Sequence, residues 1–436
     1  MNNVVTLSPI KIHLSLKLGV NENTEGYYDF LKRIADTQGV VSVPALTPQQ
    51  TRYENLTADV YDIRLMTWQY QDENSAAALV FHVYPNGVAV VEALLPSVSY
   101  TNAKDLEQQT QQQTKALIRQ AYRDFFQLQQ KLTEHVGSTY FETLGKVLGE
   151  YPYQEEAGPD ILWVARTLFF REETLKNADI KKLIKDWLEE TEKPQDATKL
   201  INGEISFSMT WLNYVIVDKK NVIEDKNDAI VDSSEDINND TASYSSRLLI
   251  DTMIMAQYYY TAQELCNQHL KAAISNAYLN ARLHETEKNL GRVRAVARLH
   301  LVAFHEHLKH LNRGKRKLLE SFLASWDFND LIENSQRMVE VCNSKLEEAN
   351  HQRRERSSLL TDLLLVSLSF FAVFELSLFL TQLSREMMSR PALDYQDEST
   401  SFFLSQIANI DVDVMITLGF AVTLGLVFVY RYIKTR

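Results

Sequence analysis

A few polar side chains stand in an apolar stretch near the C-terminal end of this chain. Glu375 is the single ionisable residue between Leu363 and Leu383, and seven-residue steps relate it to Thr361, Leu368 and Gln382. On a helix such residues share one face. A carboxylate in hydrocarbon is costly, so we predict that this face looks toward a pore or a partner helix. The alternative is a protonated glutamate, or one that reaches toward the outer boundary.

Two other sets of residues near this stretch are candidates. A neighbouring face is an alternative pore lining with an aromatic constriction. It consists of Ser367, Phe370, Phe374, Ser377 and Thr381. Arg353 and Arg356 precede the stretch, and several copies around one axis would form a cationic ring, a cytosolic gate. Simple anchoring at the membrane surface explains these two arginines as well.

A third set of candidates lies in the N-terminal half. Arg166 is the one charge in the apolar-leaning run Ile161 to Phe170, Arg171 closes that run, and Asp218 ends a second one. Arginines beside an acidic residue at strand ends suit a phosphate-bearing nucleotide. An internal ion pair between arginine and aspartate explains the same pattern.

Other chemistry is not indicated. His300, His305, His307 and His310 crowd one predicted helix, but position 309 is Lys, where a zinc-protease motif would need His. We expect a solvated helix face there rather than a metal site. Glycine-rich phosphate loops and nucleophile motifs are absent, so we do not expect an enzyme. The formal net charge of −12 argues against nucleic-acid binding.

The apolar segments 363–383 and 414–433 are each long enough to cross a bilayer. Basic residues precede the first and follow the second, whereas the connection between them carries six acidic residues: Glu386, Asp394, Asp397, Glu398, Asp411 and Asp413. The positive-inside rule therefore predicts that both termini are cytoplasmic, and we expect the protein in the inner, cytoplasmic membrane. With only Cys266 and Cys342 present, the remainder suits a reducing cytosol.

The region before the membrane segments changes character twice. Residues 1–244 indicate an α+β head with a mainly antiparallel or mixed sheet, ending in a solvated acidic loop at 218–244. The expected strands are 3–18, 61–70, 76–84, 88–95, 161–171 and 205–217, and the expected helices are 25–35, 102–136 and 180–190. Pro85-Asn86-Gly87 predicts a hairpin turn.

Residues 245–358 indicate a helical stalk, and residues 359–436 a membrane domain. The stalk is interrupted at 326–330, where Asp327 or Asn329 is the candidate N-cap of a helix that continues to Leu383. A heptad seam runs along that helix from Ile332 to Leu363. The seam has two interpretations, packing on residues 247–312 of the same chain or an inter-subunit bundle.

This order of elements resembles the CorA family of divalent-cation channels over residues 327–436. The resemblance implies a cytosolic α/β head, a long stalk helix that continues into the first membrane helix, and five subunits around a pore. The family's Gly-Met-Asn motif is missing, and residues 382–391 contain neither Gly nor Asn. The chain is therefore more similar to divergent CorA-like membrane effectors of type III CRISPR defence, which implies a nucleotide messenger as ligand.

Three hypotheses follow from these patterns and from what the resemblance implies. The first is a ligand-gated oligomeric effector or channel in antiviral defence. The second is a divalent-cation channel of the Mg²⁺ type without the usual filter, and the third is a membrane-anchored scaffold. The expected partners are the lipid bilayer, further copies of this chain and a small nucleotide.

Overall fold

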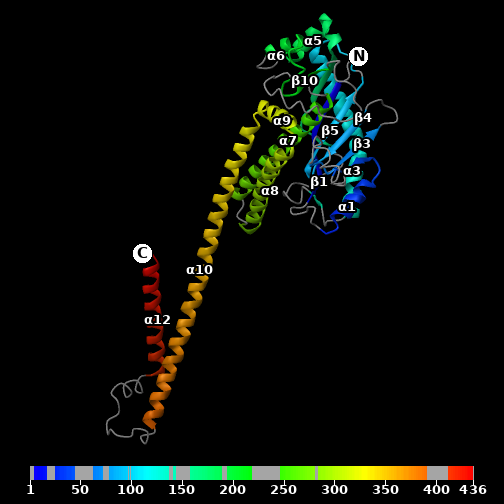
Figure 1. Cartoon of the computed structure of the whole chain (residues 1–436). Helices are drawn as coiled ribbons and strands as arrows, with labels where there is room; N and C mark the ends of the chain where they lie inside the picture. The colour runs from blue at the N-terminus through cyan, green and yellow to red at the C-terminus, as the bar shows by residue number, and fades with distance from the viewer. Residues whose placement is uncertain are drawn as a thin grey trace. The chain divides into compact units, whose positions relative to one another are not determined.

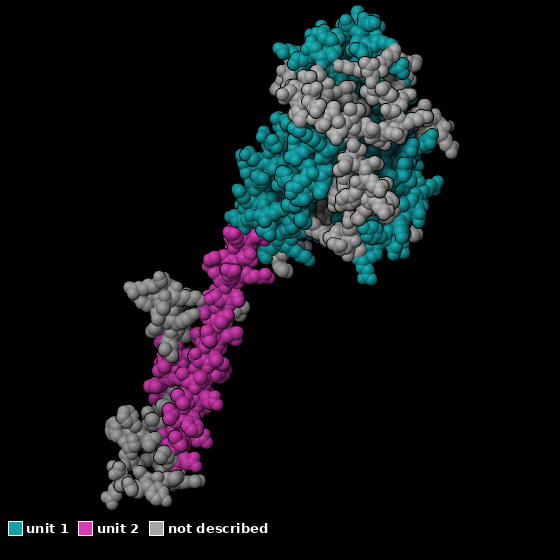
Figure 2. Space-filling model, in the orientation of Figure 1, with its two compact units in different colours: residues 1–345 teal, residues 346–436 magenta. Residues whose placement is uncertain are grey.

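The structure is a computed structural model that divides into two compact units, residues 1–345 and residues 346–436 (Figure 2). It describes residues 4–16, 25–44, 62–71, 78–96, 98, 100–136, 141–143, 158–188, 194–218, 246–279, 283–389 and 411–435. Residues 246–345 of the predicted stalk, 245–358, belong to the same unit as the sheet. The acidic loop predicted at 218–244 lies outside the described residues except for Asp218.

Within the described residues of the first unit, the strands form one ten-stranded mixed sheet (Figure 1). Its path is β2-β3-β4-β5-β1-β8-β10-β9, and β6 and β7 also pair with β1. The β8–β10 pair is parallel and the other pairs are antiparallel. The strands are β1 (Val4–Leu16), β2 (Val40–Ser42), β3 (Met66–Gln71), β4 (Ala78–Val83), β5 (Asn86–Leu95), β6 (Phe141–Thr143), β7 (Asp160–Ile161), β8 (Ala165–Arg171), β9 (Phe207–Met209) and β10 (Asn213–Asp218).

Helices cover both faces of this sheet. Because side chains alternate along β1, its residues contribute to separate hydrophobic cores on the two faces. Val5 and Leu7 share a core with α7 (Ser246–Leu279), α8 (Leu283–His310) and α9 (Arg313–Ser325). Ile10 and Ile12 share a core with α1 (Tyr27–Ala35) and α3 (Ala103–Val136) on the opposite face. Val4 contributes to a third core with α5 (Ala178–Leu188) and α6 (Pro194–Ile201).

Three predicted strands are shorter than expected. The run 205–217 is a hairpin of β9 and β10, because the Thr210 hydroxyl accepts a hydrogen bond from the Asn213 N–H and reverses the chain without Gly or Pro. The run 61–70 becomes a strand only at Met66, since Asp62 accepts from the Arg64 N–H in a local turn. The run 161–171 is divided between β7 and β8, which pair with different parts of β1.

The predicted break before the stalk helix is present. α9 ends at Ser325 and α10 runs from Phe328 to Ser389. Asp327 stands between them with φ of 52°, in the left-handed region that Asp tolerates better than most residues. Its carbonyl accepts from the Asp330 and Leu331 N–H groups, so Asp327 occupies the N-cap position.

The heptad seam packs within the chain along its first part. Asn267 of α7 donates to the Leu331 carbonyl at 2.9 Å, and Arg294 of α8 donates to Asn343 at 2.8 Å. The buried seam residues there are Ser335, Val339 and Cys342. Of the two interpretations of the seam, intrachain packing describes the residues up to Lys345.

The second unit contains the apolar part of α10 and the helix α12 (Val412–Thr435), which lie side by side (Figure 1). In the part of the chain that the structure describes, α10 is the one helix that is both long and apolar enough to cross a membrane. Leu364, Leu368 and Phe371 are 67%, 69% and 65% exposed. A core helix of a soluble protein would bury such residues, so their exposure indicates association with a membrane.

Candidate functional site

The apolar part of α10 has two different faces, and α12 covers one of them. The rings of Phe370 and Phe420 meet edge to face with their centroids 5.9 Å apart. At Gly419 of α12, an added Cβ would lie 3.7 Å from Val373 Cγ1 and 3.8 Å from Ser377 Oγ, which is ordinary packing distance. Gly419 therefore lies at the contact between the two helices, and an alanine would also fit there.

Hydroxyl groups on this covered face are satisfied by their own helices. Ser377, Thr381 and Ser384 donate to the carbonyls of Val373, Ser377 and Leu380, and Thr423 donates to Gly419. Thr381 and Thr423 are 5% and 6% exposed. Ser377 and Thr381, two residues of the alternative pore lining predicted from the sequence, thus lie in the contact between α10 and α12 of the same chain. Phe374 stacks on Phe370, whereas Ser367 is exposed.

Glu375 lies on the other face of α10. Its side chain is exposed, and so are those of Thr361, Leu368 and Gln382. The seven-residue series predicted from the sequence is thus an uncovered face within this unit. In a bilayer it would present the Glu375 carboxylate and the Gln382 amide away from α12, and these two groups need a protein or water partner there. The Thr361 hydroxyl on the same face already donates to the Ser357 carbonyl.

The arginines before the apolar segment lie on α10 within the second unit. Arg353 is exposed. Arg356 belongs to the helix, but its side chain lies outside the described part of the structure. The ring expected from these two residues stays a prediction, because it requires several copies of the chain.

Arg166 is an internal ion-pair residue. It is 2% exposed, its Nη2 lies 2.7 Å from Glu107 Oε1, and its Nη1 donates to the Glu107 carbonyl at 3.4 Å. Glu107 belongs to α3, whereas the expected acidic partner was Asp218. Of the two interpretations of Arg166, the internal ion pair is therefore the one that the structure contains, with Glu107 as the acidic partner in place of Asp218.

Arg171 and Asp218 are brought together elsewhere. They are paired positions at the ends of the parallel strands β8 and β10, and both are exposed. Because five residues separate Arg171 from Arg166 along β8, strand alternation directs the two arginines to opposite faces. The structure thus does not assemble Arg166, Arg171 and Asp218 into one ligand site.

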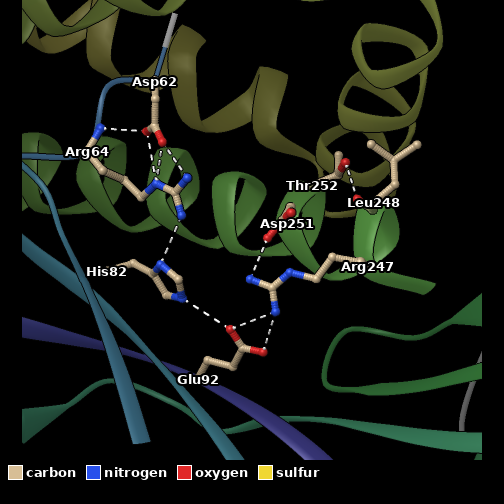
Figure 3. A network of polar contacts seen from close by, with 8 residues as sticks. All are labelled: Asp62, Arg64, His82, Glu92, Arg247, Leu248, Asp251 and Thr252. Atoms are coloured by element: carbon tan, nitrogen blue, oxygen red, sulfur yellow. Dashed lines mark hydrogen bonds and ion pairs between the residues drawn. The ribbon is translucent and has the colours of Figure 1, made fainter. Parts of the chain in front are cut away.

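A chain of charged side chains that the sequence did not reveal connects the sheet to the start of α7 (Figure 3). Arg64 holds Asp62 through two guanidinium nitrogens and contacts His82 Nδ1 at 3.1 Å. His82 Nε2 lies 3.2 Å from Glu92. Glu92 lies 3.0 Å from Arg247, whose other terminal nitrogen is 2.9 Å from Asp251. We call these six residues the polar chain.

The electrostatics of the polar chain follow from burial and opposite charge. Burial alone raises the pKa of Glu92, but the hydrogen bond from His82 and the charge of Arg247 outweigh it and lower that pKa. The pKa of Asp62 is likewise raised by burial and lowered, on balance, by Arg64. The carboxylates of Asp62 and Glu92 are thus stabilised in their charged form. In the sequence, His82 and Glu92 only interrupt two apolar strands, one interior polar residue in each.

The histidine helix differs from the predicted solvated face. His307 is 2% exposed and hydrogen-bonds to the Tyr259 hydroxyl, and the His300 ring packs on Tyr258 and Tyr259. Burial lowers the pKa of His300 to about 4. His305 and His310 are exposed. Among the described residues, no group of three or more His, Cys, Asp or Glu side chains is arranged to hold a metal ion.

Comparison with known proteins assigns neither a family nor a function to this chain. No protein-family model, no curated protein and no solved structure matches the chain.

Proposed function

We propose that this chain is a self-associating membrane protein with two spans, a ligand-gated channel or membrane effector of CorA-like architecture. In this proposal α10 and α12 both cross the inner membrane, and residues 384–411 lie outside. The first unit is cytosolic and senses the ligand.

One observation carries the proposal: the Glu375 face of α10 is exposed while the opposite face already packs on α12. A charged carboxylate that faces lipid at the centre of a membrane helix makes insertion of that helix less favourable by about 3 kcal/mol. Since α12 lies on the other face, the group that shields Glu375 comes, in this proposal, from another molecule. Further copies of the same chain would place Glu375, Gln382 and Thr361 around a common axis, as a polar pore lining.

The missing Gly-Met-Asn motif favours a gated effector over a Mg²⁺ transporter. For the sensed ligand we propose a phosphate-bearing nucleotide, with Arg171 and Asp218 as contact residues, in an antiviral defence response. Arg166 takes no direct part, because Glu107 holds it on the opposite face of the sheet.

The test is ion flux through liposomes that contain the purified full-length chain. Glu375→Leu should leave the assembly intact, because it removes a polar group from hydrocarbon, and should change flux about tenfold or more. Ser377→Ala is the matched control, since Ser377 faces α12 and its hydroxyl is satisfied by the Val373 carbonyl. Its flux should equal that of the wild type.

Two outcomes would overturn parts of the proposal. Unchanged flux in Glu375→Leu, with an intact assembly, would assign Glu375 to helix packing. Selective Mg²⁺ flux in the absence of any nucleotide would favour the divalent-cation channel instead of the gated effector.

A further inference from the structure

α8 carries two apolar stripes, whereas a surface helix of a folded unit typically has one. The first stripe is buried within the chain and consists of Leu290, Val293, Ala297, Phe304 and Leu308. The second consists of Ala295, Leu299 and Val302, which share one side of the helix through steps of four and three residues. Leu299 and Val302 are 52% and 57% exposed. Packing within the chain therefore does not account for the second stripe.

The second stripe lies in a positively charged stretch of α8. Between Lys288 and Phe304 this helix contains four basic residues and no acidic one. Lys288 and Arg298 are exposed, and Arg298 adjoins Leu299. Two copies of this surface would repel each other, because like charges would meet around the apolar centre. A matching partner surface is apolar at its centre and acidic around it.

The outer side of α10, the helix beside α8, has that composition. Its residues 329–342 contain one basic residue, Arg337, and three acidic ones: Asp330, Glu333 and Glu340. All four side chains are exposed, and Glu333 pairs with Arg337 at 3.1 Å. Glu340 adjoins Val341, an apolar side chain that is 38% exposed. The charges of the two outer sides are therefore complementary.

The two surfaces lie at the same height, because α8 and α10 run antiparallel and side by side (Figure 1). The rings of Phe304 and Phe328 meet with their centroids 5.3 Å apart, and Arg294 donates to Asn343 at 2.8 Å. Residues 295–303 of α8 and 329–342 of α10 lie between these two contacts. Copies related by rotation about the membrane normal keep their heights. Residues 295–303 of one copy are then level with residues 329–342 of the next.

We propose that α8 of one copy binds α10 of the next copy in the membrane. Leu299 and Val302 pack on Val341, and Arg298 lies near Glu340. Each copy contributes two different surfaces, so the contact is heterologous and its repetition closes a ring. The partner is a second copy, because one chain carries both complementary surfaces at one height. The inference rests on the proposed function, since it requires several copies in one membrane.

Cysteine cross-linking of the full-length chain in liposomes tests this contact. A variant with both Leu299→Cys and Val341→Cys, oxidised by dioxygen with a copper catalyst, should form a ladder of covalent multimers on a non-reducing gel. The two single variants reconstituted together should stop at dimers, because each copy then has one reactive surface. Each single variant by itself should stay monomeric on the gel. Wild-type protein is the control for Cys266 and Cys342, which are buried.

Charge exchange provides a second test, which does not depend on the geometry of a disulfide. Arg298→Glu and Glu340→Arg should each raise the apparent Kd of assembly about fivefold, because an attraction at the rim becomes a repulsion. The double variant restores opposite charges and should return to near the wild-type value. Energy transfer between labelled copies, measured over a range of lipid-to-protein ratios, gives this Kd. Arg119→Glu, in an exposed position of α3, should behave like the wild type.

The outcomes separate this inference from the proposed function. A chain that stays monomeric at every lipid-to-protein ratio would overturn both the contact and the proposed self-association. An intact assembly without covalent multimers from the double cysteine variant would overturn the contact alone, and so would a double charge variant no better than the single ones. Cross-linking of Leu299→Cys by itself would show that α8 meets α8, which also overturns the heterologous contact.

Discussion

At the scale of single residues, Arg166 and Glu375 illustrate two fates of a charge in an apolar segment. Both interrupt such a segment in the sequence, and the pattern alone treats them alike. Arg166 is shielded within the chain, since Glu107 of α3 lies 2.7 Å away. Glu375 is exposed on a membrane-type helix. Only the fold separates a charge that is paired within the chain from one that lies exposed in the described part of it.

The Arg166 pair should matter for stability. Glu107→Ala leaves a buried guanidinium without its carboxylate, which should lower the free energy of unfolding by on the order of 2 kcal/mol, less than for a fully dry pair because Glu107 is 35% exposed. Arg171→Ala, at an exposed strand end, should change it by less than about 0.5 kcal/mol. Chemical denaturation of the purified protein measures both, and equal effects would contradict the structural role of Arg166.

At the scale of elements, the sequence predicted those with a long regular pattern. β1, α3 and the β4–β5 hairpin follow from alternation, helical spacing and Asn86-Gly87. The turn at Thr210–Asn213 was missed because a Thr side chain makes it inside an apolar run. The polar chain was missed for a related reason: its members lie up to 189 positions apart, between Asp62 and Asp251, and only the folded sheet brings them together.

The contact between α10 and α12 gives a prediction at this scale. Gly419→Leu places a large side chain where even a Cβ lies 3.7 Å from Val373, so the two helices should separate. Gly425→Leu is the matched control, because nothing lies within 4 Å of a Cβ at that position. Amide exchange over residues 412–428 in nanodiscs should increase about tenfold in Gly419→Leu and stay near wild type in Gly425→Leu. The reverse order would show that α12 packs through its other face.

At the scale of the whole molecule, the boundary between the two units falls at Lys345. The three hydrophobic cores described around the sheet all lie before it. The described apolar residues after it are largely exposed, as expected for a part that completes its burial in lipid or in an assembly.

A fragment of residues 1–345 should therefore fold and remain soluble, and it can test the proposed ligand. Thermal shift with cyclic and adenylated nucleotides should show stabilisation that Arg171→Ala weakens by one to two decades of affinity, roughly 1.5–3 kcal/mol for a lost charge-assisted contact. Arg119→Ala is the control, because it removes an exposed arginine of α3 that has no proposed role, and it should respond like the wild type. A well-folded fragment that no nucleotide stabilises would contradict nucleotide sensing at this site.

The predicted topology assigns opposite sides of the membrane to two positions near the C-terminus. Single cysteines introduced at Ser389, after the apolar part of α10, and at Thr435, in the last turn of α12, should react with an impermeant maleimide from opposite sides. The native thiols should contribute little background, because burial raises the pKa of Cys266 to about 12 and that of Cys342 to about 11, and thiolates are the reactive form. Wild-type protein is the control for that background. Labelling of both introduced cysteines from the same side would rule out α12 as a second span and leave α10 as the sole anchor in the described part of the chain.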